Sequence, residues 1–322
     1  MDKKLHHGRT VSRREFLGAP LFLGLGAVVL GRVTKASAAE PHLQFPTEPR
    51  QRLAVTSYPF RAWIESPTNP ERDKSKPGMD LKDFPGMVAK EFGVYNINPL
   101  GAHLRSTDPA YLQEFRTAVA KARSHLVDLG LGGGRFWDPD RARVQAAVDN
   151  GKKWIDIALV LGSPSVRQHL TGSPGVRPDA GRAAASLGRL AEYGASKGIV
   201  INLENDSLRS EDPFFIVSVI EKVGNRYLRA LPDFGNSIRG HGAAYNQRAM
   251  AQMFPHAFNM SHVKDTVAGD GGQIYKVDVA RIFSIAQASG YRGYFSMEWE
   301  DKAGDPYEGT RRLVAESLRC LA

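Results

Sequence analysis

Four residues with metal-binding side chains each close a short apolar segment of the chain. The segments are 199–203 before Glu204, 228–232 before Asp233, 257–260 shortly before His262, and 294–297 before Glu298. We expect each segment to be a buried strand, and a charged group next to a core costs free energy unless it is paired or bound to a metal. Two glutamates, an aspartate and a histidine are suitable oxygen and nitrogen ligands for a divalent cation. These residue types therefore predict a metal site.

The four residues are separated by 29, 29 and 36 positions, about the length of one strand–helix–strand unit. Repetition at this interval indicates parallel strands that bring a polar residue to the same rim. Further strands are expected at 53–58, 94–100, 125–131 and 163–169, and helices at 81–92, 108–123, 138–161, 182–197, 212–223, 278–288 and 306–321, with a brief helix within 240–253. Eight strands alternating with about eight helices predict an α/β fold, a (β/α)8 TIM barrel. The alternative, an open doubly wound sheet, requires a glycine-rich turn after its first strand, which Tyr58-Pro59-Phe60 does not supply.

The N-terminus has the features of an export signal. Ser12-Arg13-Arg14-Glu15-Phe16-Leu17 resembles the twin-arginine signature, 19–31 is apolar, and Ala36-Ser37-Ala38 is typical of a signal-peptidase site. The apolar run is shorter than the ~20 residues that span a bilayer, so we expect no stable membrane anchor after cleavage. The expected domains are a signal peptide at 1–38, a linker at 39–52 and a barrel at 53–322. The expected location is the periplasm or another extracytoplasmic space.

Composition limits the classes of partner. The whole chain carries a net charge of +9, but residues 1–38 contribute seven Lys/Arg and two Asp/Glu, so the mature chain carries +4. A charge this small does not favour nucleic acid as a partner. A multi-zinc nuclease is also disfavoured, because residues 39–322 hold seven histidines, few of them at strand ends. Cys320 is the only cysteine, which excludes an intramolecular disulfide.

The chain resembles the xylose isomerase-like TIM-barrel family of sugar isomerases and epimerases over about 50–322. The resemblance is carried by Leu203-Glu204-Asn205, Pro232-Asp233-Phe234-Gly235-Asn236, His262-Val263-Lys264-Asp265 and Ser296-Met297-Glu298, supported by 151–158, 161–163 and Val166-Arg167. It implies that Glu204, Asp233, His262 and Glu298 bind one divalent metal ion: Mn, Mg, Co or Zn. The sequence has Asp206 and Asn236 at two positions where relatives carry histidine, which argues against a plain ketose epimerase.

Such a site implies a metal-dependent isomerase or epimerase of a sugar or sugar-like polyol. The metal acidifies a proton next to a carbonyl, and Glu204 and Glu298 remove and return that proton through an enediolate. Lys264 either stabilises the enediolate charge or pairs structurally with Asp265. Further substrate contacts are expected from His103, Arg167 and Asn236, although His103 is equally well explained as a loop histidine.

Two other functions remain open on the sequence. One is a lyase or hydrolase acting on keto-glycosides, which uses the same proton abstraction but expels a substituent. The other is a non-catalytic sugar-binding barrel. In each case the partner is a small-molecule carbohydrate, and the sequence leaves a homo-oligomer open.

Overall fold

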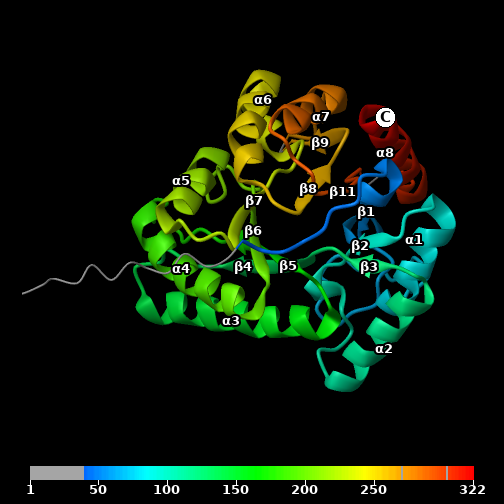
Figure 1. Ribbon diagram of the computed structural model, residues 1–322, viewed down its shortest axis with the longest axis horizontal. Coiled ribbons are helices and arrows are strands. Elements are labelled where there is room, and N and C mark those ends of the chain that lie inside the picture. The colour runs from blue at the N-terminus through cyan, green and yellow to red at the C-terminus, as the bar shows by residue number, and fades with distance from the viewer. Residues whose placement is uncertain (1–39, 270, 302–303) are drawn as a thin grey trace, which may run out of the picture. The chain divides into compact units, whose positions relative to one another are not determined.

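The computed structural model describes residues 40–269, 271–301 and 304–322, which form a parallel barrel surrounded by helices (Figure 1). The predicted signal peptide lies outside these residues. The barrel strands are β1 (Leu53–Thr56), β2 (Asn96–Asn98), β3 (His125–Leu126), β4 (Leu129–Gly134), β5 (Ser165–Leu170), β6 (Val200–Glu204), β7 (Leu228–Leu231), β8 (Met260–Val263) and β11 (Tyr294–Met297). β3 and β4 are two halves of one barrel strand, so the predicted number of eight is confirmed.

Parallel pairing closes the barrel. One sheet runs in the order β3-β2-β1-β11-β8 and the other in the order β4-β5-β6-β7. Parallel bridges join them on both sides, between Leu100 and Gly130 and between Asp233 and His262. The predicted TIM barrel is therefore confirmed, with the carboxyl ends of all strands at one rim.

The helices start and end where the local sequence dictates. They are α1 (Phe84–Phe92), α2 (Pro109–Lys121), α3 (Arg141–Leu161), α4 (Ala180–Lys197), α5 (Pro213–Val223), α6 (Gly242–Met253), α7 (Val279–Ala288) and α8 (Pro306–Leu321). Asp212 caps α5 by accepting hydrogen bonds from Phe214 and Phe215, and Gly224 ends this helix in the left-handed conformation. In α3, a Cβ on Gly151 would lie 2.8 Å from the Leu190 side chain, so the glycine lets α3 pack closely on α4.

Three elements differ from the sequence-based expectation. β8 begins at Met260, not at Ala257, so His262 lies within the strand. α6 is a full helix of 12 residues where only a brief one was expected. An unexpected hairpin, β9 (Thr266–Ala268) with β10 (Ile274–Lys276), follows β8. Its strands are three residues long, too short to give an alternating pattern in the sequence.

The described part of the predicted linker packs on the amino-terminal end of the barrel. Glu40 forms ion pairs with Arg226 and Arg229, and the ring of Phe45 packs edge-on against Phe258 and Tyr294. These contacts cover the end of the barrel that lies opposite the strands' carboxyl ends.

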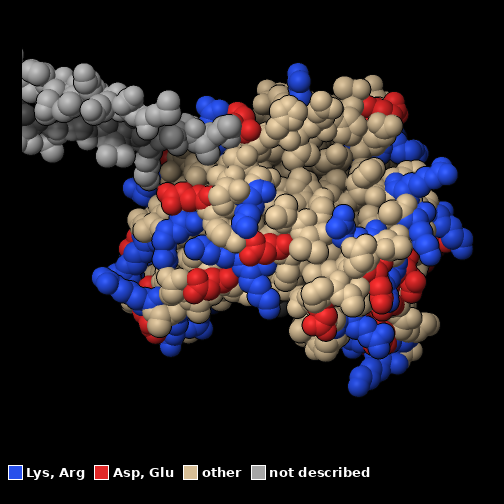
Figure 2. Space-filling view, turned by 60° about the horizontal axis from the view of Figure 1, so that its bottom comes forward, with Lys and Arg blue, Asp and Glu red and all other residues tan. Residues whose placement is uncertain are grey.

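Charged side chains of both signs are interspersed on the molecular face shown in Figure 2. Typical exposed pairs are Lys82 with Glu114 and Arg311 with Glu91. Exposed pairs of this kind contribute little to stability, which leaves the buried core as its main source. In the described residues, no helix combines the length and apolarity that a membrane span requires.

Candidate active site

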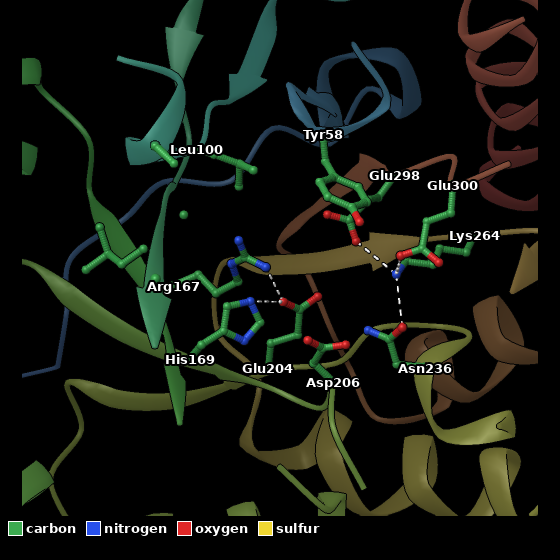
Figure 3. A pocket seen from close by; sticks show the side chains of 14 residues that line it. Tyr58, Leu100, Arg167, His169, Glu204, Asp206, Asn236, Lys264, Glu298 and Glu300 are labelled. Carbon is green, nitrogen blue, oxygen red and sulfur yellow. Dashed lines mark hydrogen bonds and ion pairs between the residues drawn. The ribbon is translucent and has the colours of Figure 1, made fainter. Parts of the chain in front are cut away.

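A pocket opens at the carboxyl ends of the barrel strands, where the loops after the strands surround it (Figure 3). Its polar lining comes from several strands: Arg167 and His169 from β5, Glu204 from β6, and Glu298 just after β11. Active sites of TIM barrels lie at this end, because the strands fix the positions of the side chains at their tips.

The four predicted metal ligands converge at the base of this pocket. Glu204, Asp233, His262 and Glu298 are at most 4% exposed, and each offers one ligand atom within 4.8 Å of the others. His262 Nδ1 lies 2.6 Å from Glu204 Oε1 and 3.2 Å from Glu298 Oε2. We refer to these four residues as the cage.

One carboxylate oxygen of the cage is available to bind a cation. Asp233 Oδ1 accepts hydrogen bonds from the backbone N–H groups of Gly235 and Asn236, at 2.9 and 2.7 Å. Asp233 Oδ2 is buried and accepts no hydrogen bond in the described part of the chain, although Lys264 Nζ lies 3.3 Å away. A buried carboxylate oxygen that accepts no hydrogen bond costs free energy, and a bond to a metal ion would offset that cost.

The charges around the cage also fit a divalent cation. Glu204, Asp233, Glu298 and the neighbouring Glu300 carry four negative charges, and Arg167 and Lys264 carry two positive ones. With His262 neutral and Asp233 ionised, these six groups together carry a charge of −2, which one divalent cation balances. A mixed carboxylate and imidazole donor set suits Mn²⁺, Mg²⁺, Co²⁺ or Zn²⁺.

The pKa values of the cage residues reflect the same excess of negative charge. Burial lowers the pKa of His262, but Glu298 and Glu204 outweigh it and raise that pKa to about 10. Burial raises the pKa of Asp233 to about 7, against the attraction of Lys264. For Glu298, burial is outweighed by His262 and Lys264, which lower its pKa to about 2. A proton on His262 thus supplies the positive charge that a bound cation would bring.

Lys264 is buried among acidic groups and not paired with its sequence neighbour. It is 1% exposed, and its Nζ lies 2.5 Å from Glu300 Oε1, 3.1 Å from Glu298 Oε2 and 3.0 Å from Asn236 Oδ1. Asp265 instead pairs with Arg312 at 2.7 Å. Both Lys264 and Asn236 line the pocket, and their contact with a substrate stays a prediction.

The other two predicted substrate contacts have different positions. Arg167 lines the pocket, forms a buried ion pair with Glu204, and leaves its Nε without a hydrogen bond among the described residues. His103 is not among the described residues that line the pocket. It is 2% exposed, its Nδ1 lies 2.8 Å from Ser57 Oγ, and burial lowers its pKa to about 3. His103 ends the short turn at Gly101–His103 and its ring contacts Ser57, just after β1, so the prediction of a substrate contact is corrected to a neutral core histidine.

Sequence reasoning missed His169 and Glu211. His169 is the penultimate residue of β5 and lines the pocket beside Glu204 (Figure 3). Its Nδ1 lies 2.9 Å from Glu211 Oε1. The position of His169 near the end of a strand was a usable signal, whereas Glu211 lies in a loop whose course only the structure reveals. Ligand atoms of His169, Asp206 and Glu211 also lie within 4.8 Å of one another.

Comparisons with known proteins agree with this geometry. The model of the xylose isomerase-like TIM barrel family matches residues 88–322. The chain belongs to this family. No curated protein matches the sequence.

Several solved structures share the fold. A xylose isomerase-like TIM barrel protein from Mycobacterium smegmatis, in complex with magnesium, is 19% identical with a TM-score of 0.62, over 88% of this chain and 98% of that one. A D-psicose 3-epimerase is 15% identical with a TM-score of 0.66, over 84% and 99% of the two chains. A 3-keto-D-glucoside 4-epimerase from E. coli is 14% identical with a TM-score of 0.61, over the same shares. At these identities the likeness establishes the fold.

Asp206, Asn236 and Arg239 form a linked polar group at the pocket. Arg239 Nη2 donates to Asp206 Oδ1 at 3.0 Å and to Asn236 Oδ1 at 2.8 Å. Asn236 Oδ1 also accepts from Lys264, so the arginine and the lysine share this oxygen. Asp206 and Asn236 line the pocket, and Arg239 therefore fixes two of its lining side chains.

Proposed function

We propose that this protein is a metal-dependent isomerase or epimerase of a sugar or sugar-like polyol. The observation that carries the proposal is the pairing of Glu204 and Glu298 around His262 at the base of the pocket, each with its own buried cationic partner. Arg167 pairs with Glu204, and Lys264 lies 3.1 Å from Glu298. The epimerases with similar folds support a carbohydrate that carries a carbonyl group.

The residues of the cage would hold the cation, and Glu204 and Glu298 have a further role. When bound, a divalent cation polarises a carbonyl and its neighbouring hydroxyl and so acidifies the proton on the carbon between them. Glu204 and Glu298 have pKa values below their ordinary range, because nearby cationic groups outweigh the effect of burial, so both are ionised and able to accept a proton. One removes the proton and the other returns it.

Lys264 supplies the charge that opposes the developing oxyanion. Its ammonium group lines the pocket and is fixed by Glu300 and Asn236, so it needs no rearrangement when negative charge develops on the substrate. Fixed donors of this kind stabilise an enediolate more strongly than mobile water does. Arg167 keeps Glu204 ionised, and its unpaired Nε is a donor for a substrate hydroxyl.

A lyase or hydrolase acting on keto-glycosides is the second candidate. The observation that favours it is His169, which lies beside Glu204 and lines the same pocket, where a ring nitrogen can donate a proton to a departing oxygen. The fold neighbour that acts on a 3-keto-D-glucoside supports a substrate of this type. Release of the glycosidic substituent distinguishes this reaction from epimerisation.

We also propose that the chain is exported through the twin-arginine pathway. The support is the sequence around Arg13 and Arg14, which lies outside the described residues. This pathway carries folded proteins, which suits a protein whose metal is loaded before export.

Deuterium exchange tests the proposed chemistry. The protein is loaded with Mn²⁺, Mg²⁺, Co²⁺ or Zn²⁺, its metal content is measured, and it is incubated in D₂O with ketoses and keto-glycosides. We expect cation-dependent deuterium incorporation at the carbon next to the carbonyl, detected by mass spectrometry and NMR. A protein that holds one cation and binds a sugar, yet exchanges no proton in any member of the panel, is a binding protein and not an isomerase.

A further inference from the structure

The interior of the barrel contains a network of buried polar side chains below the cage. Asp128 is 0% exposed and sits at its centre. Its Oδ1 accepts hydrogen bonds from Ser165 Oγ at 2.5 Å and Asn202 Nδ2 at 3.0 Å, and its Oδ2 accepts from Asn98 Nδ2 at 3.2 Å. Asn98 in turn contacts the cage, because its Oδ1 lies 2.8 Å from His262 Nε2.

The network determines which way the amide of Asn98 points. Its Nδ2 faces two acceptors, the Oδ2 and the backbone oxygen of Asp128, both at 3.2 Å. The reversed amide would place Oδ1 against the backbone oxygen of Asp128, which has no proton to share. Oδ1 therefore faces His262, and an oxygen there can only accept a hydrogen bond. The ring nitrogen opposite it, Nε2, must carry the proton.

A neutral imidazole has one protonated nitrogen, so a proton fixed on Nε2 leaves the lone pair on Nδ1. Nδ1 is the atom that faces Glu204 and Glu298. Only a ring nitrogen with a free lone pair can bind a metal. The hydrogen-bond partner of one ring nitrogen therefore decides whether the other nitrogen has that lone pair.

We propose that Asp128, through Asn98, fixes the His262 tautomer that binds the cation, and so sets the cation affinity of the cage from within the barrel. Asp128 and Asn98 are positioning residues, because Asp128 is hydrogen-bonded to Asn98, and Asn98 contacts Nε2 and not the ligand atom. The inference rests on the proposed cation site but not on the proposed reaction, so it can be tested by binding alone.

Three variants test the network. Asn98→Ala removes the acceptor of the Nε2 proton, and Asn96→Ala is its matched control: Asn96 lies in the same strand, is 6% exposed, and donates only to the backbone oxygens of Gln51 and Leu53. Asp128→Asn places a donor against Asn98 Nδ2 and allows the Asn98 amide to turn. Its control is Asp138→Asn, another buried carboxylate, which accepts from Ser173 outside the pocket.

The third variant exchanges the two side chains. In Asp128→Asn/Asn98→Asp, the amide at 128 keeps an oxygen for Ser165 and Asn202 and donates its NH₂ to the carboxylate at 98. That carboxylate still offers an acceptor to His262 Nε2. The exchange restores the donor at position 128 and the acceptor opposite Nε2, although the bond from position 98 to the backbone oxygen of residue 128 is lost.

Binding of Mn²⁺ to the metal-free protein is followed by the EPR signal of free Mn²⁺, and folding is checked by circular dichroism. We expect Asn98→Ala and Asp128→Asn to weaken binding by about 10–100-fold, the usual effect of losing the partner of a ligand histidine. Both controls should bind as the wild type does, and the exchange variant should recover part of the loss.

NMR spectroscopy of the His262 ring gives a second readout. In the Mg²⁺-loaded wild type, we expect a slowly exchanging Nε2–H resonance of His262 in ¹H–¹⁵N spectra, and we expect it to be lost in Asn98→Ala. Folded single variants with unchanged Mn²⁺ affinity overturn the inference, as does an exchange variant no better than Asp128→Asn. A wild type that binds no Mn²⁺ overturns the proposed cation site as well.

Discussion

Glu211 fixes the ring of His169: Nδ1 of the histidine lies 2.9 Å from Oε1 of the glutamate, and Nε2 lies on the cage side, 3.6 Å from Glu204 Oε2. Glu211 is itself held by the backbone N–H groups of Leu170 and Ser207, at 2.6 and 3.3 Å. The arrangement presents one ring nitrogen to the pocket in a defined orientation.

We expect His169→Ala to lower kcat/KM by up to about tenfold, the value of one hydrogen bond of ~0.5–1.5 kcal/mol. Glu211→Gln should produce a smaller loss, because the ring remains but its orientation is less fixed. Steady-state kinetics on the active sugar measure both effects. His256→Ala is the control, since His256 contacts Glu221 at 3.5 Å outside the pocket. Equal losses in the control and in His169→Ala would mean that His169 does not contact the substrate.

Replacing either cage glutamate by glutamine separates metal binding from proton transfer. Glu204→Gln and Glu298→Gln keep an oxygen ligand but lose the base, so we expect much of the metal to remain and turnover to fall by ~10²–10⁴-fold. Metal analysis and deuterium washout from the substrate are measured together. Washout that persists in one variant while product formation stops identifies the residue that returns the proton. Near-normal turnover in both variants rules out the proposed proton transfer.

Lys264→Met should destabilise the protein strongly. It removes the ammonium group that Asp233, Glu298 and Glu300 share and leaves Glu298 with His262 alone, and breaking a buried ion pair in this way costs about 3–5 kcal/mol. Urea unfolding of the metal-free protein measures the loss, and added Mn²⁺ should restore part of it by balancing the charge. Lys82→Met, at the exposed pair with Glu114, should have little effect. A Lys264→Met variant as stable as the wild type would show that the lysine is not needed for charge balance.

A divalent cation should stabilise the protein, and more so at higher pH. In the metal-free protein, the pKa of His262 is raised to about 10. Protonation of His262 therefore adds to the free energy of unfolding, in full below pH ~6.5 and progressively less as the pH rises toward 10. The raised pKa of Asp233, about 7, adds a further loss as the pH rises from ~4 to 7. A bound cation takes the place of these protons, so the gap between loaded and chelated protein widens with pH.

Calorimetry with Mn²⁺ or with chelator between pH 5.5 and 8 measures this gap. At a cation concentration 100 times Kd, the gain should reach about 2.7 kcal/mol. In Asp233→Asn, the backbone N–H groups of Gly235 and Asn236 hold the amide oxygen, so the NH₂ group faces the cation and the gain should be smaller. A gain that shrinks as the pH rises would contradict the charge balance described for the cage.

Changing Arg13 and Arg14 together to lysine should block export. Cell fractionation with an antibody to the barrel measures precursor and mature protein in each compartment. The wild-type chain should be recovered outside the cytoplasm with its N-terminus near Ala39. If the double variant is exported normally, the twin-arginine route is wrong.

The sequence alone located the cage. Strand and helix lengths are set locally, by turns, caps and apolar periodicity, so the repeat at Glu204, Asp233, His262 and Glu298 was readable without coordinates. In parallel strands that close a barrel, such a repeat brings the side chains to one rim. Lys264 and Asn236 follow the same rule, because each lies within three residues of a cage ligand.

The tertiary structure decided the contacts that depend on which loops meet. His103 and His169 both follow or end a strand, yet one ring packs on Ser57 in the core and the other faces the pocket. Glu211 and Arg239 reach the site through the loops after β6 and β7, and loop courses are set by long-range packing that leaves no periodic trace. The hydrogen bonds from Asp128 through Asn98 to His262 join residues 30 and 164 positions apart, so only the closed barrel brings them together.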